Sequence, residues 1–126
     1  MDDQVTGGCK CGSVRYIGQR SSEEMFRCFC RDCQQLTGSG HSNMVPLCRS
    51  GFETQGNYRV FEMVGGSGAP TWSGFCGTCG APLTRSSKRM AKHIYVHAGS
   101  LDDPTLYNPK RFIYAEAAQP WDLGKL

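Results

Sequence analysis

Cysteine placement is the feature that most constrains this sequence, because seven of the eight cysteines fall into three short clusters. A disulfide framework usually spreads its cysteines along the chain, whereas clustered thiols in a reducing compartment favour metal ligation. The sequence therefore predicts a metal-binding fold in which the lone cysteine packs as a small apolar residue. The clusters are Cys9/Cys11, Cys28/Cys30/Cys33 and Cys76/Cys79, and the lone cysteine is Cys48.

The length and the first residues of the chain indicate how many domains it forms and in which compartment it lies. The 126 residues, of which 39% are hydrophobic, fit one modest core, and we expect a single domain over residues 1–126. No apolar run is long enough to cross a bilayer, so we expect no membrane partner. The opening residues Met1–Gln4 are acidic and polar and lack the basic and apolar stretches of a secretory signal. We therefore expect a cytoplasmic protein.

The net charge of the metal-free chain would be misleading, because the formal value of +3 counts every cysteine as neutral. Zinc binds thiolates, so a four-thiolate site contributes about −2 and a three-thiolate site about −1. With both sites filled the protein is close to neutral. We therefore expect no nucleic-acid partner. The sequence leaves the oligomeric state open.

Two short ligand pairs, separated by 64 residues, carry the strongest signal. Tetrahedral zinc needs four donors at about 2.3 Å, and the pairs Cys9/Cys11 and Cys76/Cys79 supply them. A structural Zn²⁺ here would close a long loop and contribute strongly to folding. The alternative is a set of reduced core cysteines without metal. Glycines, which tolerate the positive φ that tight turns require, flank both pairs at Gly7, Gly8, Gly12, Gly77 and Gly80.

The third cluster, Cys28, Cys30 and Cys33, is called the triplet below. It offers three thiolates within six residues and no obvious fourth protein ligand. Structural zinc sites are closed by four protein ligands, while catalytic sites keep one position open. The triplet is therefore typical of an exchangeable, catalytic zinc site, and a thiol is its natural fourth ligand. A weak or vacant site is the alternative.

Short apolar stretches, punctuated by sixteen glycines and six prolines, are typical of a mainly β fold. We expect one short helical turn at residues 31–36, a loop at 65–70 and a turn at Asp102-Asp103-Pro104. Strands are expected at residues 13–17, 24–28, 42–47, 58–64, 71–75, 82–85, 93–98 and 111–116.

The histidines are expected to play structural or surface roles. His93 and His97 lie in an alternating segment, so with Tyr95 they share one face of a strand. His41 lies just past the triplet and could approach an open coordination position, although an ordinary loop histidine is the interpretation we prefer. Three aromatic residues are expected in the core or at a rim: Trp72, Tyr114 and Trp121.

Several segments together resemble the glutathione-dependent formaldehyde-activating enzyme family, which includes the centromere protein V relatives. Their order and spacing cover nearly the whole chain. The matching segments are Gly8-Cys9-Lys10-Cys11-Gly12-Ser13-Val14-Arg15-Tyr16, Cys28-Phe29-Cys30-Arg31-Asp32-Cys33 with Thr37-Gly38, Phe75-Cys76-Gly77-Thr78-Cys79-Gly80-Ala81-Pro82-Leu83, Ala98-Gly99-Ser100-Leu101-Asp102-Asp103-Pro104 and Pro120-Trp121.

The resemblance implies a small, mainly antiparallel β domain built around zinc, of the Mss4-like or β-tent type. It implies a structural zinc on Cys9, Cys11, Cys76 and Cys79 and a second zinc, associated with catalysis, on Cys28, Cys30 and Cys33. The implied activity is carbon–sulfur lyase chemistry on a thiol–aldehyde adduct such as S-hydroxymethylglutathione, with glutathione as the small-molecule partner.

The chain departs from the family pattern in two places. Phe29 stands where relatives commonly carry histidine, and Trp72-Ser73-Gly74 stands where many have a basic residue. Both changes put glutathione in question as the substrate. The alternative function is a non-catalytic zinc scaffold that binds a protein. A zinc-containing methionine sulfoxide reductase is set aside, because no cysteine follows Cys79.

Overall fold

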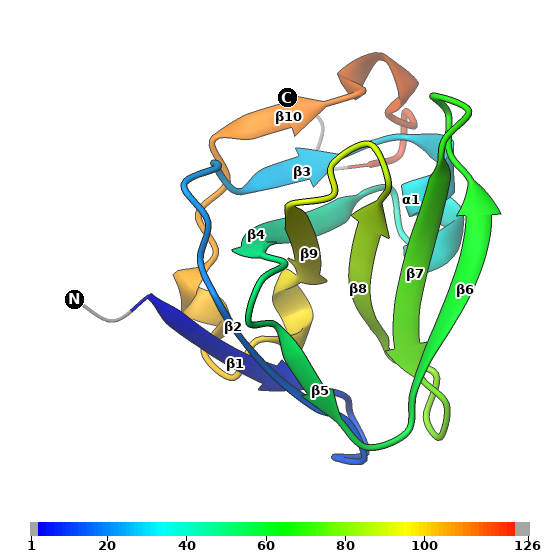
Figure 1. Ribbon diagram of the computed structural model, residues 1–126. Helices are drawn as coiled ribbons and strands as arrows, with labels where there is room; N and C mark the ends of the chain where they lie inside the picture. Colours follow the sequence, from blue (N-terminus) through cyan, green and yellow to red (C-terminus); the bar gives the residue numbers. More distant parts are fainter. Residues whose placement is uncertain (1–2, 123–126) are drawn as a thin grey trace.

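The computed structural model describes residues 3–122, which form two β-sheets and one short α-helix (Figure 1). The small sheet has the strand order β1-β2-β5 and the large sheet the order β10-β3-β4-β9-β8-β7-β6. The predicted mainly β architecture is confirmed. The small sheet contains β1 (Gln4–Gly8), β2 (Arg15–Gln19) and β5 (Glu53–Gln55). The large sheet contains β3 (Phe26–Cys28), β4 (Ser42–Cys48), β6 (Tyr58–Val64), β7 (Pro70–Cys76), β8 (Pro82–Ser87), β9 (His93–His97) and β10 (Arg111–Ile113).

The centre of the large sheet is buried on both faces. Val45 of β4 lies opposite Val96 of β9, and both are fully buried in the core that the large sheet shares with the small one. Side chains alternate between faces along a strand, so the neighbouring Met44 belongs to a different cluster. This second cluster consists of Phe26, Cys28, Cys33 and Met44. One face of the sheet therefore supports the core, and the other carries Cys28 and packs against Cys33 of the helix that follows β3.

Helix α1 (Arg31–Thr37) follows β3 directly and occupies the position of the predicted helical turn. Cys30 is its N-cap and accepts a hydrogen bond from the N–H of Cys33, while Gly38 ends the helix in the left-handed conformation. The buried Gln34 donates to the carbonyl oxygens of Phe29 (2.8 Å) and Ala117 (3.1 Å). These bonds fasten the helix to the C-terminal segment.

Some predicted elements differ from the observed ones. Strand β1 was not predicted, because Val5 is its only large apolar residue and two of its five residues are glycine. It forms through antiparallel pairing with β2 along its whole length. The three-residue β5 was also not predicted. The strand expected at residues 111–116 stops at Ile113, because Tyr114 takes a positive φ of 55° and a 3₁₀ helix, η3 (Ala115–Ala117), follows.

One strand pair departs from the antiparallel pattern. β10 pairs with β3 in parallel, with Arg111 opposite Phe26. Between β9 and β10 the chain passes through two 3₁₀ helices, η1 (Ala98–Ser100) and η2 (Pro104–Leu106). This long connection returns the chain to the edge of the sheet running in the same direction as β3.

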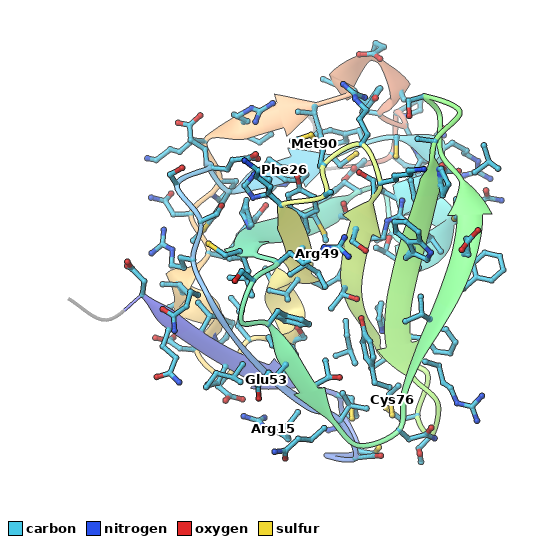
Figure 2. All side chains as sticks on the ribbon, viewed as in Figure 1. Arg15, Phe26, Arg49, Glu53, Cys76 and Met90 are labelled. Carbon is cyan, nitrogen blue, oxygen red and sulfur yellow. The ribbon has the colours of Figure 1, made fainter. Side chains whose placement is uncertain are left out.

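Cys76 of the second ligand pair and Phe26, which packs beside the triplet, lie at opposite ends of the molecule. Figure 2 shows Cys76 at one end of the molecule, whereas Phe26 and Met90 lie toward the opposite end. None of the helices within residues 3–122 is long and apolar enough to cross a membrane.

Candidate metal centres

The four cysteines of the two ligand pairs converge, and together they are called the knuckle site below. Their Sγ atoms all lie within 4.8 Å of one another. The Sγ atom of Cys11 is 3.6 Å from that of Cys9 and 3.8 Å from that of Cys76. A tetrahedral ion with Zn–S bonds of about 2.3 Å needs sulfurs about 3.8 Å apart. The observed sulfur spacing therefore fits zinc.

The two ligand pairs turn in the same way, although one has a single residue between its cysteines and the other has two. Gly12 follows Cys11 with φ of 83°, and Gly80 follows Cys79 with φ of 79°. The N–H of Gly80 donates to the carbonyl oxygen of Cys76 at 2.8 Å, and the N–H of Gly12 donates to that of Cys9 at 3.3 Å. The predicted need for glycine at positive φ is confirmed at these two positions.

Backbone N–H groups surround the sulfur of Cys76, which is fully buried. The N–H groups of Thr78 and Cys79 donate to its Sγ atom at 3.3 Å and 3.4 Å. These bonds lower the pKa of Cys76 to about 6, and the bond from Cys79 has the largest effect. Burial acts in the opposite direction but does not outweigh them. The turn thus favours the thiolate, which is the form that binds metal.

The other ligands of the knuckle site differ in charge preference. The N–H of Val14 donates to the Sγ atom of Cys9 at 3.1 Å. Backbone N–H groups, that of Ala81 foremost, lower the pKa of Cys79. The N–H of Ser13 acts in the same sense on Cys11, but burial and the neighbouring thiols outweigh it and raise the pKa of Cys11 to about 11. Without a cation, four thiolates repel one another, so this arrangement requires a positive ion to be fully charged.

The triplet is built by one local stretch of chain. Cys28 ends β3, Cys30 caps α1 and Cys33 lies in its first turn, so a strand-to-helix turn brings the three sulfurs within 4.8 Å of one another. Cys28 and Cys33 are buried, and Cys30 is half-buried. No described His, Cys, Asp or Glu joins this group as a fourth ligand within residues 3–122.

One sulfur of the triplet carries charge more readily than the other two. The thiols of Cys28 and Cys33 donate to Cys30 and lower its pKa, and the positive charge of Arg85 acts in the same direction. The pKa of Cys28 is raised, first by its bonds to Cys30 and Cys33 and then by burial. The triplet therefore also needs a cation before all three sulfurs ionise.

The triplet opens into a cavity of about 430 Å³, called the triplet cavity below. All three cysteines line it, together with two groups of side chains. One group is apolar and includes Phe26, Met44, Tyr95 and Ile113. The other is cationic and consists of Arg31, Arg85 and Arg89, and the hairpin residues Gly65, Gly66 and Ser67 also contribute to the lining.

The structure assigns the predicted histidines to contacts with other side chains. His93 and His97 lie on β9, as predicted, and Nε2 of His93 lies 2.9 Å from Oε2 of Glu23. His41 does not reach the triplet. Its Nδ1 lies 2.7 Å from Oδ2 of Asp122, so His41 is a loop histidine, the interpretation preferred above.

Burial distinguishes His97 from the other two histidines. It is 8% exposed, and its Nε2 has no hydrogen-bond partner within the described residues. Burial, with the charge of Arg85 as a smaller cause, lowers the pKa of His97 to about 4, so its ring is neutral at physiological pH.

Several other predictions concern turns and rims. At the predicted turn, Asp103 caps η2 and Asp102 forms an ion pair with Arg15. Cys48 is half-buried, and its Sγ atom donates to the carbonyl oxygen of Arg20 at 3.8 Å. Tyr114 is 53% exposed at the rim of the triplet cavity.

Comparison with known families agrees with this geometry. The model of the glutathione-dependent formaldehyde-activating enzyme family matches residues 4–117, a range that contains all seven clustered cysteines. The chain belongs to this family.

No curated protein matches the chain significantly. Among solved structures, the chain is similar to a Rhodobacter sphaeroides protein determined as a structural genomics target. The TM-score is 0.64 at 21% sequence identity, over 85% of this chain and 98% of that one. At this level of identity the similarity shows a shared fold.

The structure shows where the two departures from the formaldehyde-activating family pattern lie. Phe29 is 2% exposed, and its ring packs against that of His41 with the two ring centroids 5.3 Å apart. Ser73, in the segment that lacks a basic residue, lies directly opposite Arg85 in the pairing of β7 with β8. The neighbouring strand therefore supplies a cation to the cavity. Sequence reasoning missed Arg85 because this pairing joins positions twelve residues apart.

Proposed function

We propose that this chain is a zinc-dependent enzyme of the carbon–sulfur lyase type, which forms or cleaves a thiol–aldehyde adduct such as S-hydroxymethylglutathione. The observation that carries the proposal is a cluster of three cysteines, without a fourth protein ligand among residues 3–122, on the wall of a cavity of about 430 Å³. We further propose that residues 1–126 act as a single domain.

The two cysteine groups are assigned different roles in this proposal. Cys9, Cys11, Cys76 and Cys79 would hold a structural zinc, because four thiolates close a tetrahedral site. Cys28, Cys30 and Cys33 would hold a second, exchangeable zinc, because three thiolates leave one position for a substrate. The sulfur spacing and the soft donors support zinc at both sites.

When bound by the triplet, zinc would supply a positive charge that promotes loss of the proton from a substrate thiol. In adduct formation the thiol sulfur bonds to the carbonyl carbon and the thiol proton ends on the carbonyl oxygen, and cleavage is the reverse. The apolar side chains Phe26 and Met44 exclude water beside the triplet. Arg85 favours negative charge at Cys30 and would favour it equally at a substrate sulfur or oxygen nearby.

The test is the rate at which the zinc-loaded protein equilibrates glutathione and formaldehyde with their adduct, measured by NMR exchange. The matched variant is Cys30→Ser, because serine keeps the N-cap of α1 while removing a thiolate ligand. We expect the wild-type protein to accelerate exchange and the variant to lose at least about tenfold of that acceleration. Equal rates for both proteins, with zinc confirmed in the wild-type triplet, would overturn the proposal.

A second candidate function is a non-catalytic zinc scaffold that binds a protein. It is favoured by β6, where three apolar side chains are exposed: Val60 (52%), Phe61 (55%) and Val64 (70%). Exposed apolar side chains on an edge strand are typical of a binding surface. Metal stoichiometry separates the two functions. Two tightly bound zinc ions favour the enzyme, whereas one ion and unreactive triplet cysteines favour the scaffold.

A further inference from the structure

The triplet cavity has two chemically different sides. Its cationic side carries three arginines, and among residues 3–122 Asp32 is the only acidic residue in the lining. Its apolar side includes Phe26 and Tyr95, whose rings meet edge to face with centroids 5.3 Å apart. A ligand that fills this cavity therefore meets excess positive charge on one side and a dry surface on the other.

Arg85 is the arginine best placed to act on such a ligand. It is half-buried on β8, whereas Arg31 and Arg89 are exposed. Its Nη1 lies 3.9 Å from the Sδ atom of Met63. No carboxylate within residues 3–122 forms an ion pair with it, because the ion pairs of that range join Arg15, His41 and His93 to their acids.

A half-buried guanidinium without a carboxylate partner leaves several of its five N–H donors to solvent, so an anion that enters the cavity can take the place of that water. Zinc-loaded thiolates supply some negative charge of their own, because three thiolates and one Zn²⁺ carry about −1. The lining contains three arginines and one aspartate, so cationic capacity remains after this compensation. The remaining partner is expected to enter with the substrate.

We infer that Arg85 determines specificity by binding a carboxylate of the thiol substrate, whose carbon skeleton lies against Phe26 and Tyr95. The inference rests on the proposed function, since it assumes that a thiol enters the cavity at the triplet. The substrate class is then a thiol that carries a carboxylate, and thiols with a neutral or cationic end are discriminated against. A guanidinium suits this task because its planar donors match the two oxygens of a carboxylate.

The experiment measures the binding of two thiols of equal length to the zinc-loaded protein by titration calorimetry. The thiols are 3-mercaptopropionate and its neutral amide, 3-mercaptopropanamide. We expect the wild-type protein to bind the carboxylate at least about tenfold more tightly than the amide. Arg85→Gln should bring the ratio close to one because it lowers the affinity for the carboxylate more than the affinity for the amide, and Arg85→Lys should keep part of the preference.

The matched control is Arg59→Gln on β6, which removes the same charge from a residue outside the cavity. It should leave the preference unchanged, which separates a local contact from the net charge of the protein. If Arg85→Gln does not fold, the wild-type preference is followed from roughly 0.05 M to roughly 0.5 M salt, and it must shrink because the contact is partly exposed.

The outcomes separate this inference from the function on which it rests. If the wild-type protein binds both thiols equally well, or if Arg85→Gln keeps the preference, the inference is wrong and the proposed function stands. If neither thiol binds to a zinc-loaded wild-type protein that still accelerates the glutathione–formaldehyde exchange, the inference alone is wrong. If the protein neither binds the thiols nor accelerates the exchange, both are wrong. A preference that is insensitive to salt would also overturn the assignment to Arg85.

Discussion

The knuckle site and the triplet use the same ligand atom in opposite ways. In the knuckle site, sulfurs from residues near the start of the chain meet sulfurs 65 residues further on, as the 3.8 Å separation between Cys11 and Cys76 shows. In the triplet, one strand-to-helix turn of six residues supplies every sulfur. The first arrangement joins two parts of the fold, and the second adds nothing to long-range connectivity.

The two sites also differ in the groups that surround their sulfur atoms. Backbone N–H groups donate to the knuckle sulfurs, and a glycine with positive φ closes each of the two turns. In the triplet, the N–H of Cys33 donates to the Sγ atom of Cys30, and the three sulfurs also line a cavity with an apolar side and an arginine side. The comparison teaches that the number of cysteines matters less than where their chain segments come from. Under the proposed function, a site made from distant segments would stabilise the fold, while a site made from one segment would be free to exchange its fourth ligand.

The largest expected effect comes from breaking the knuckle site. Cys76→Ser removes a fully buried ligand, so we expect the variant to lose zinc and cooperative folding, because structural zinc in small proteins contributes on the order of 10 kcal/mol. Circular dichroism and elemental analysis measure both losses. Cys30→Ser should retain the fold and lose only the second zinc, and Cys48→Ser should change neither. A well-folded Cys76→Ser protein would contradict the structural role.

A smaller effect is expected at the glycines that close the knuckle turns. Gly80→Ala places a β-carbon on a residue with φ of 79°, and no other atom lies within 4 Å of that carbon, so the cost is backbone strain alone. We expect a loss of about 1–2 kcal/mol in the free energy of unfolding. Chemical denaturation with zinc present measures it.

The matched control for this substitution is Gly66→Ala in the β6–β7 hairpin. That glycine has no positive φ, and its added β-carbon also meets no atom within 4 Å. The control should leave stability unchanged within about 0.5 kcal/mol. Equal effects of both substitutions would show that the turn geometry is not the cause.

The smallest effect concerns the ion pair of Asp102 with Arg15, which follows the first ligand pair. Hydrogen bonding to Arg15, with Thr6 as a further donor, lowers the pKa of Asp102 to about 2 from 3.8. A carboxyl group whose pKa is lowered by folding stabilises the folded state at every pH above the pKa that the group has in the unfolded chain. This contribution is lost only as the pH falls from 3.8 to about 2. Both side chains are nearly half exposed, so the contribution is at most about 1 kcal/mol.

We therefore expect the free energy of unfolding of Asp102→Asn to differ from that of the wild-type protein by the same amount at every pH between 8 and 5. Thiolate protonation weakens zinc binding as the pH falls, and this change affects both proteins equally. Parallel losses of unfolding free energy across that range are the expected result. A difference that disappears between pH 8 and pH 5 would show that Asp102 titrates in that range, so that folding raises its pKa above 3.8 where a decrease is expected.

Sequence pattern predicted the local features well. Strand β6 at Tyr58–Val64 was predicted with its observed bounds, because turn-forming residues border an apolar run. The helical turn after Cys30 was predicted because the segment lacks glycine and proline. By contrast, β1 and β5 were missed, since their own residues carry a weak strand signal and pairing with β2 decides their conformation.

Family resemblance and cysteine spacing predicted both groups of cysteines whose sulfurs the structure brings together. The arginine side of the triplet cavity was not predicted. Arg85 reaches the cavity through its pairing with β7, and Arg31 reaches it from α1. Spacing in the sequence cannot reveal that these side chains share one cavity with Tyr95 of β9.

The sequence by itself determined which atoms can bind metal and how each short turn bends, because thiol spacing and glycine placement act over a few residues. Only the tertiary structure decided that sulfurs from two distant turns meet, and that an unpaired arginine and an apolar wall surround the triplet. The physical reason is that these arrangements depend on strand register and on the face to which each side chain points. A shift of one residue in the register would turn Arg85 away from the cavity.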